Sequence, residues 1–234
     1  MATAGHVSWI LVEDGDSVTL VDAGWPKDYE RVVASLERIG RAPADVDSIL
    51  LTHAHVDHMG PAEEFRTRHS ISVRAHHAEE DLARGVTKPG LNAAKLLTMA
   101  WRPAMLRFVF IALGRGGTSL TPLSEVATFD NGEALDTAGS PVPVHLPGHT
   151  AGSTCYLFPA RGVLVTGDSL VNVDMFSNEI GARVMPPAFN HDHEAAVRSL
   201  DRLEGLQASV IAPGHGPVMQ TTPARAVAEA LARA

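Results

Sequence analysis

The sequence has little of several features that define common protein classes. It has one cysteine in 234 residues, which excludes a disulfide framework and a zinc finger built on cysteines. Basic residues are outnumbered, with 19 Lys and Arg against 27 Asp and Glu. The resulting net charge of -8 argues against a protein that binds the phosphates of a nucleic acid.

Long hydrophobic runs are also missing. The longest apolar stretch, residues 96–114, is interrupted by Arg102, Pro103 and Arg107, whereas a spanning helix needs about 18 nearly uncharged residues. The N-terminus shows neither the basic nor the apolar segment of a signal peptide. We therefore expect a cytoplasmic protein with no membrane span. The length suits one globular domain, predicted over 1–234, with a helical apolar insertion at about 89–118.

Apolar periodicity and turn signals predict an alternation of strands and helices. The predicted strands are 18–22, 46–52, 71–73, 128–135, 142–146, 154–158, 162–166 and 208–212. The predicted helices are 29–39, a helix from Pro61, and 91–110, 192–203 and 223–234. This order predicts an α/β sandwich with helices on both outer faces.

Histidine is the residue in excess, with 12 copies, and three of them follow the predicted strand 46–52. His53 and His55 are two residues apart in an extended segment, so both side chains point to the same side and can hold one ion. Asp57 and His58 come next, on the turn into the following helix. Four such ligands without a thiolate suit zinc, iron or manganese.

Three later strands also end in a ligand-type residue beside glycine. These ends are Pro147-Gly148-His149, Thr166-Gly167-Asp168 and Pro213-Gly214-His215. A single Pro-Gly-His is only a turn. Four ligand-bearing strand ends in succession indicate a metal site.

From Asp22 to His215 this set of motifs resembles the metallo-β-lactamase superfamily. The resemblance implies a four-layer αββα sandwich, with two divalent metal ions at one edge of the two sheets. The implied ligands are His53, His55 and His149 for a first metal, Asp57, His58 and His215 for a second, and Asp168 as the bridge. Asp22 resembles the acid that orients the ligands without binding metal, a role that fixes histidine tautomers.

The resemblance implies a dinuclear hydrolase in which a hydroxide bridging the metals attacks a carbonyl ester, lactone or thioester of a small metabolite. Asp57 is the candidate catalytic proton shuttle. Zinc is the expected metal, with iron or manganese as alternatives. Two other activities of the same fold stay open. One is a persulfide dioxygenase holding a single iron on His53, His149 and Asp168, and the other is a phosphodiesterase, against which the negative charge argues.

The substrate pocket is expected to be partly apolar. Trp25 closely follows Asp22, and Phe176 is the aromatic residue nearest after Asp168. Leu106 and Phe110, from the apolar segment, are expected to contact an apolar tail of a small-molecule substrate. The same segment also suits a lid, the interface of a homodimer, or simple packing on the sheet.

Overall fold

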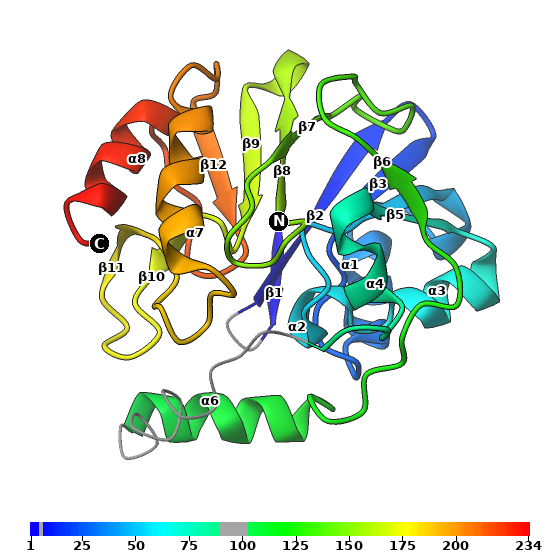
Figure 1. The fold of residues 1–234 in the computed structure, drawn as a ribbon. Helices are drawn as coiled ribbons and strands as arrows, with labels where there is room; N and C mark the ends of the chain where they lie inside the picture. The colour runs from blue at the N-terminus through cyan, green and yellow to red at the C-terminus, as the bar shows by residue number, and fades with distance from the viewer. Residues whose placement is uncertain (5–6, 89–102) are drawn as a thin grey trace.

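The computed structural model of the chain describes residues 1–4, 7–88 and 103–234 (Figure 1). Its larger sheet contains, in spatial order, β1 (Ala2–Ala4), β2 (Val7–Asp14), β3 (Ser17–Val21), β4 (Val46–Leu50), β5 (Ser72–His76) and β6 (Ala127–Phe129). β1, β2 and β3 pair antiparallel, and the remaining neighbours pair parallel. The parallel strands direct their carboxyl ends to one edge of the sheet.

A second sheet packs against the first. Its strands, in spatial order, are β12 (Val210–Pro213), β9 (Val163–Gly167), β8 (Thr154–Phe158) and β7 (Val142–His145). β12 is parallel to β9, and the other pairs are antiparallel. β10 (Val171–Val173) and β11 (Ile180–Arg183) form a separate two-stranded ribbon.

Helices cover the outer faces of the two sheets, and α6 lies across one edge of the molecule (Figure 1). The α-helices are α1 (Tyr29–Glu37), α2 (Val56–Met59), α3 (Ala62–His69), α4 (Glu80–Ala83), α6 (Pro103–Gly114), α7 (His193–Ser199) and α8 (Pro223–Leu231). Short 3-10 helices lie at η1 (Pro43–Asp45), η2 (His77–Glu79), η3 (Pro159–Arg161) and η4 (Leu200–Leu203). Within the described residues, none of the helices has the length and apolar character that crossing a membrane requires.

The four layers follow from strands that are buried on both faces. In β3, Leu20 belongs to the core beneath α1 and α3, whereas the next residue, Val21, belongs to the core between the sheets. In β9, Leu164 packs in the core beneath α7 and α8, and Val165 packs between the sheets. Alternation along a strand therefore produces three apolar cores and the order helix, sheet, sheet, helix. The predicted αββα sandwich is confirmed (Figure 1).

Some predicted boundaries were wrong. The strand predicted over 128–135 ends at Phe129, because the chain bends over residues 131–133, where Gly132 has a φ of +101°. The strands β1, β2, β10 and β11 were not predicted. Residues 91–102 of the helix predicted over 91–110 lie outside the described residues, and α6 begins at Pro103.

Candidate metal centre

The ends of three strands and one loop bring the predicted ligands together. The segment after β4 carries His53 to His58, and the loop between β7 and β8 carries His149. β9 and β12 lead into Asp168 and His215, and the backbone N–H of Gly214 donates to the carbonyl of Gly167 at 2.8 Å. Gly214 has no room for a side chain, since a Cβ there would contact Asp168 Oδ1 and His58. These backbone contacts hold the segments of the predicted ligands against one another.

His53, His55 and His149 form what we call the first group. The three ring centroids are 4.6 to 4.7 Å apart, and each pair of rings is close to perpendicular. His55 Nδ1 and His149 Nε2 are 2.9 Å apart. One nitrogen from each ring lies within 4.8 Å of the others. This group could hold a metal ion.

Asp57, His58 and His215 form the second group, whose ligand atoms also lie within 4.8 Å of one another. Asp168 lies between the two groups. Its Oδ2 is 3.5 Å from His149 Nε2 and 3.2 Å from His215 Nε2, and its Oδ1 is 3.3 Å from His58 Nε2. One carboxylate can therefore contact ions in both groups.

Hydrogen bonds fix the tautomers of the ligand histidines. Asn190 Nδ2 donates to the carbonyl of Met185, so Asn190 Oδ1 accepts from His149 Nδ1 at 3.0 Å. The second ring nitrogen of His149, Nε2, then keeps its lone pair toward the first group.

Asp22 makes comparable contacts in the second group. Its Oδ2 accepts from His58 Nδ1 at 2.8 Å and from Thr52 Oγ1 at 2.7 Å. The Thr52 hydroxyl in turn accepts from His53 Nδ1 at 3.1 Å. Both His58 and His53 therefore present Nε2 to the cluster.

The electrostatics differ between the groups. Burial, together with the neighbouring imidazoles, holds the pKa of His53 and His55 well below the usual value, so both are neutral. Burial also opposes the charging of His58, but the carboxylates of Asp168, Asp22 and Asp57 outweigh it and raise the His58 pKa well above the usual value. Without an ion, the second group carries protons that the first group lacks.

Three buried atoms in this cluster form no hydrogen bond: His53 Nε2, His58 Nε2 and Asp168 Oδ1. Buried polar atoms without a partner are uncommon, and each one calls for an explanation. All three are ligand-type atoms directed at one region, and the nearby donors are imidazole nitrogens and carboxylates. The residues therefore fit divalent metal ions.

A cavity of about 140 Å³ opens beside the cluster. His55, Asp57, Asp168 and other cluster residues form its polar side. Its apolar side is formed by Trp25, Phe108, Ala112, Met175, Met185 and Phe189. None of the described lining residues is Lys or Arg. The cavity therefore suits an uncharged, partly apolar group.

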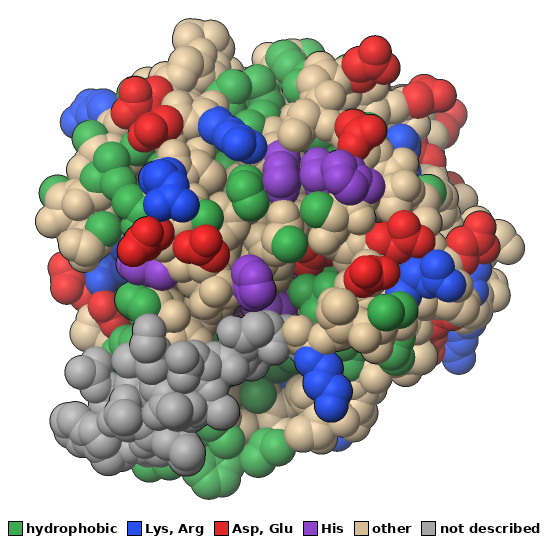
Figure 2. All heavy atoms as spheres, in the orientation of Figure 1, with side chains coloured by type: hydrophobic (Ala, Val, Ile, Leu, Met, Phe, Trp, Pro, Cys, Tyr) green, Lys and Arg blue, Asp and Glu red, His purple; other side chains and the backbone are tan. Residues whose placement is uncertain are grey.

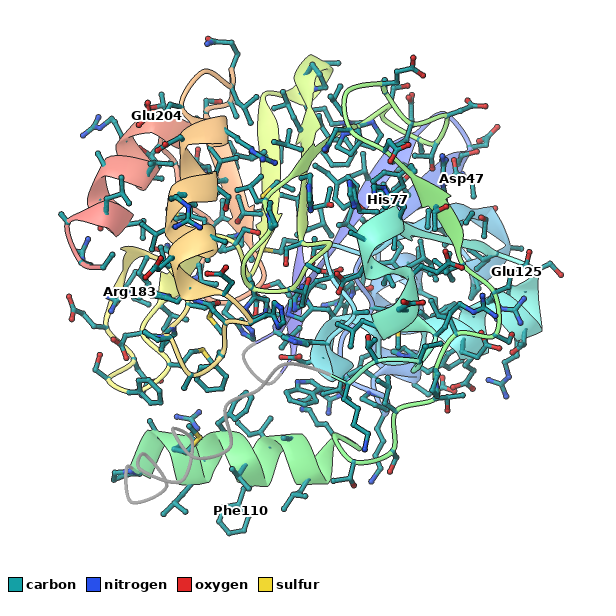
Figure 3. All side chains as sticks on the ribbon, in the orientation of Figure 1. Asp47, His77, Phe110, Glu125, Arg183 and Glu204 are labelled. Atoms are coloured by element: carbon teal, nitrogen blue, oxygen red, sulfur yellow. The ribbon has the colours of Figure 1, made fainter. Side chains whose placement is uncertain are left out.

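Of the four predicted pocket residues, one lines the cavity, one contacts a lining residue, and two lie outside the cavity. Trp25 lines the cavity, and Phe176 stacks on the lining residue Phe189 with ring centroids 6.1 Å apart. Leu106 and Phe110 are not among the described residues that line it, and their exposed fractions are 49% and 74%. Figure 3 shows Phe110 pointing away from the rest of the molecule.

The reason lies in the geometry of α6, whose inward face carries Phe108 and Ala112. Residues 106, 110 and 113 fall on the opposite side of the helix. Hydrophobic side chains gather at the lower edge of the face shown in Figure 2, where α6 lies. That this side faces a second copy of the chain stays a prediction.

Comparisons with known proteins bear on the family and the fold. The family model described as the metallo-beta-lactamase superfamily matches residues 2–215. The probable metallo-hydrolase YflN of Bacillus subtilis is 29% identical over 222 residues, which cover 88% of this chain and 78% of YflN.

Two solved structures are also similar. The metallo-beta-lactamase family protein TTHA1429 of Thermus thermophilus is 25% identical, with a TM-score of 0.67 over 95% of this chain and 72% of that chain. TTHA1623, solved in a di-iron-bound form, is 26% identical, with a TM-score of 0.61 over 94% of this chain and 93% of that one.

Proposed function

This chain belongs to the metallo-β-lactamase superfamily, and from that premise we propose that it is a dinuclear metallo-hydrolase of small esters, lactones or thioesters. The observation that carries the proposal is the pair of buried ligand groups joined by Asp168 and opening on an apolar cavity. His53, His55 and His149 would hold one ion, and Asp57, His58 and His215 the other, with Asp168 contacting both. Zinc is the metal we expect, with iron or manganese as alternatives.

Two bound divalent cations would polarise the carbonyl of the substrate and lower the pKa of a water molecule, which is the chemistry that such sites supply. The protein positions the reactants. The cavity holds the apolar part of the substrate against Trp25 and Phe189, so that its carbonyl lies beside the ligand groups. Such positioning lowers the entropy cost of attack by water.

Asp57 is our candidate for moving the proton. It lines the cavity, and its Oδ2 is 3.6 Å from His215 Nε2 and 3.9 Å from His58 Nε2. A carboxylate so placed can accept the proton of the attacking water and pass it to the leaving oxygen or sulfur. The products would be a carboxylate and an alcohol or thiol.

The apolar cavity lining favours a substrate with an uncharged acyl group. A substrate whose acyl part is charged would place that charge against Trp25, Phe108 and Phe189, away from the ligand groups. We therefore favour short apolar acyl esters, lactones and thioesters.

The first experiment measures metal content by elemental mass spectrometry on protein produced without added metal. The same protein is then assayed on matched lactones, esters, thioesters and a phosphodiester. About two ions per chain and cleavage of the carbonyl compounds would support the proposal. One iron per chain with an empty second group, or cleavage of the phosphodiester alone, would overturn it.

Asp57→Asn tests the proton shuttle. We expect a loss of about 100-fold or more in kcat, by analogy with the roughly 10²- to 10⁴-fold contribution of positioned acid-base groups. Metal content is measured on the same sample, because a loss of the second ion would reveal a ligand effect instead. Asp136→Asn, which changes an exposed carboxylate, is the matched control.

A further inference from the structure

Glu79 is a buried carboxylate whose place in the site the sequence motifs did not reveal. It ends η2, directly after β5, and only 1% of its surface is exposed. Figure 1 shows the adjoining helix α4 beside the loop that connects β7 and β8. Glu79 thus lies where the two sheets meet, between two loops that carry ligands of the first group.

Both oxygens of Glu79 accept hydrogen bonds, and the donors belong to different sheets. Oε1 accepts from the backbone N–H of Ala54, between His53 and His55, at 2.8 Å. Oε2 accepts from Thr150 Oγ1 at 2.7 Å and from the backbone N–H of Gly152 at 2.8 Å. One side chain therefore connects the loop of His53 and His55 with the loop of His149.

The fit around this carboxylate is tight. A Cβ added at Gly152 would lie 2.5 Å from the Cβ and backbone nitrogen of Glu79, much closer than atoms can approach. Two residues that closely follow His149 therefore depend on Glu79: Thr150 donates a hydrogen bond to it, and Gly152 leaves room for it. A larger residue in place of Gly152 would not fit, and a displaced Glu79 carboxylate would lose its hydrogen bonds.

Stability of the fold alone does not account for Glu79. Burying a carboxylate is costly unless it is paired or fully hydrogen-bonded. No cation among the described residues contributes to the electrostatics of Glu79, which has only the three hydrogen bonds above. An apolar residue of similar volume would fill the space at lower cost, but it could not hold two loops at a fixed separation.

Glu79 and Asp22 accept hydrogen bonds from the two residues that flank His53 in the sequence. The backbone N–H of Thr52 donates to Asp22 Oδ1 at 2.8 Å, and the backbone N–H of Ala54 donates to Glu79. The residue between them, His53, is therefore held from both neighbours. Of these two carboxylates, only Glu79 reaches the loop of His149.

We propose that Glu79 is a positioning residue for the first metal: it sets the separation of His53 and His55 from His149 by accepting hydrogen bonds from both loops. This inference rests on the proposed metal centre but not on the identity of the substrate. Removal of a group that supports metal ligands typically lowers metal affinity by about 10- to 100-fold.

The test is Glu79→Gln, which keeps the shape but replaces one oxygen with an NH₂ group. Whichever way the amide turns, a donor then faces the N–H of Ala54 or the N–H of Gly152. Glu80→Gln is the matched control, because Glu80 pairs on the surface with Arg84 at 3.2 Å. Zinc affinities are measured by competition with a chromophoric chelator, and folding is checked by circular dichroism.

Two variants that each lack one candidate ligand allow zinc binding to the two groups to be measured separately. His215→Ala leaves the first group as the stronger site, and His149→Ala leaves the second. We expect Glu79→Gln to weaken zinc binding about 10- to 100-fold in the His215→Ala protein and to leave it unchanged in the His149→Ala protein. A residue that only stabilised the fold would weaken both equally or neither.

Equal affinities of the Glu79→Gln and wild-type proteins, or equal losses in both backgrounds, would overturn the inference. Thr150→Val removes a single donor to the same carboxylate and serves if Glu79→Gln does not fold. It should weaken the first group in the same selective manner. Failure of the wild-type protein to bind zinc, iron or manganese would refute the proposed function instead, so the two failures are distinguishable.

Discussion

Removal of bound metal should destabilise this protein strongly, and the size of the effect follows from the site. His53 Nε2, His58 Nε2 and Asp168 Oδ1 are buried without a hydrogen-bond partner. An unsatisfied buried polar atom costs about 1–3 kcal/mol. His58 Nε2 and Asp168 Oδ1 lie 3.3 Å apart and partly satisfy each other, so we count them as one. Satisfying these atoms by metal coordination would therefore contribute about 2–6 kcal/mol to the free energy of unfolding.

Binding equilibria give a similar figure. A ligand at about 100 times its Kd stabilises the folded state by about 2.7 kcal/mol, so two ions contribute about 5 kcal/mol. For a chain of this size, 1 kcal/mol corresponds to about 2–4 °C in Tm. We expect a chelator to lower Tm by about 10–20 °C, measured by calorimetry with and without added zinc.

Variants locate the source of this shift. His149→Ala and His215→Ala should each remove about half of it, because each removes a ligand of one group. His69→Gln changes a histidine that hydrogen-bonds Tyr29 at 2.7 Å outside the site, and it should leave the difference intact. A Tm that is independent of chelator and of zinc concentration would refute the reasoning from the unsatisfied atoms.

The same geometry makes three further predictions. Asp22→Asn should lower the affinity for the second metal about 10- to 100-fold, because the amide cannot accept the full set of hydrogen bonds, including that from His58. Metal content after dialysis against a chelator measures this loss. Phe189→Ala should raise KM for apolar acyl substrates several-fold with little change in kcat, because Phe189 lines the cavity. Phe110→Ser should leave KM unchanged, because Phe110 is exposed outside the cavity. Equal effects of the two variants on KM would contradict this placement. Zinc binding at pH 6.5 should release protons from the second group. Nearby carboxylates outweigh burial there and raise the pKa values of His58 and His215 above the usual 6.5, so these imidazoles hold protons that zinc displaces. Calorimetric titration in two buffers of different ionisation enthalpy measures this release, which should vanish above the raised pKa values. In the metal-free protein, the stability from these two charges is fully present below the usual pKa of 6.5 and is lost as pH rises through the raised values.

The candidate ligands could be proposed from sequence because each follows a strand at a glycine or a turn. His149, Asp168 and His215 follow β7, β9 and β12 closely in sequence, so local patterns were sufficient. Glu79 and Asn190 were missed because their roles depend on partners far away in the chain. Glu79 bonds residues 25 and 73 positions distant, and Asn190 bonds a residue 41 positions distant.

The sequence also could not show which face of α6 points inward. The reason here is a different one. The helix is apolar on most of its circumference, so periodicity does not distinguish one face from the other. Tertiary contacts decide: Phe108 packs against Trp25 with ring centroids 5.9 Å apart, and Phe110 on the far side is left in solvent. Pattern predicts that such a segment is a helix, but the neighbours of the helix determine which residues reach the substrate.

The architecture also explains how loops can hold a geometry that chemistry requires to be precise. Ligands on loops would move unless their backbones were tied to the strands. Asp22, at the end of β3, accepts from the Thr52 backbone and the His58 ring, and Glu79, after β5, accepts from the Ala54 backbone and the loop of His149. Asp22 directly follows β3, and Glu79 ends the 3-10 helix η2 after β5; these two strands flank β4. Of three adjacent parallel strands, the middle one thus leads into four of the candidate ligands, and the outer two lead into the carboxylates that support them.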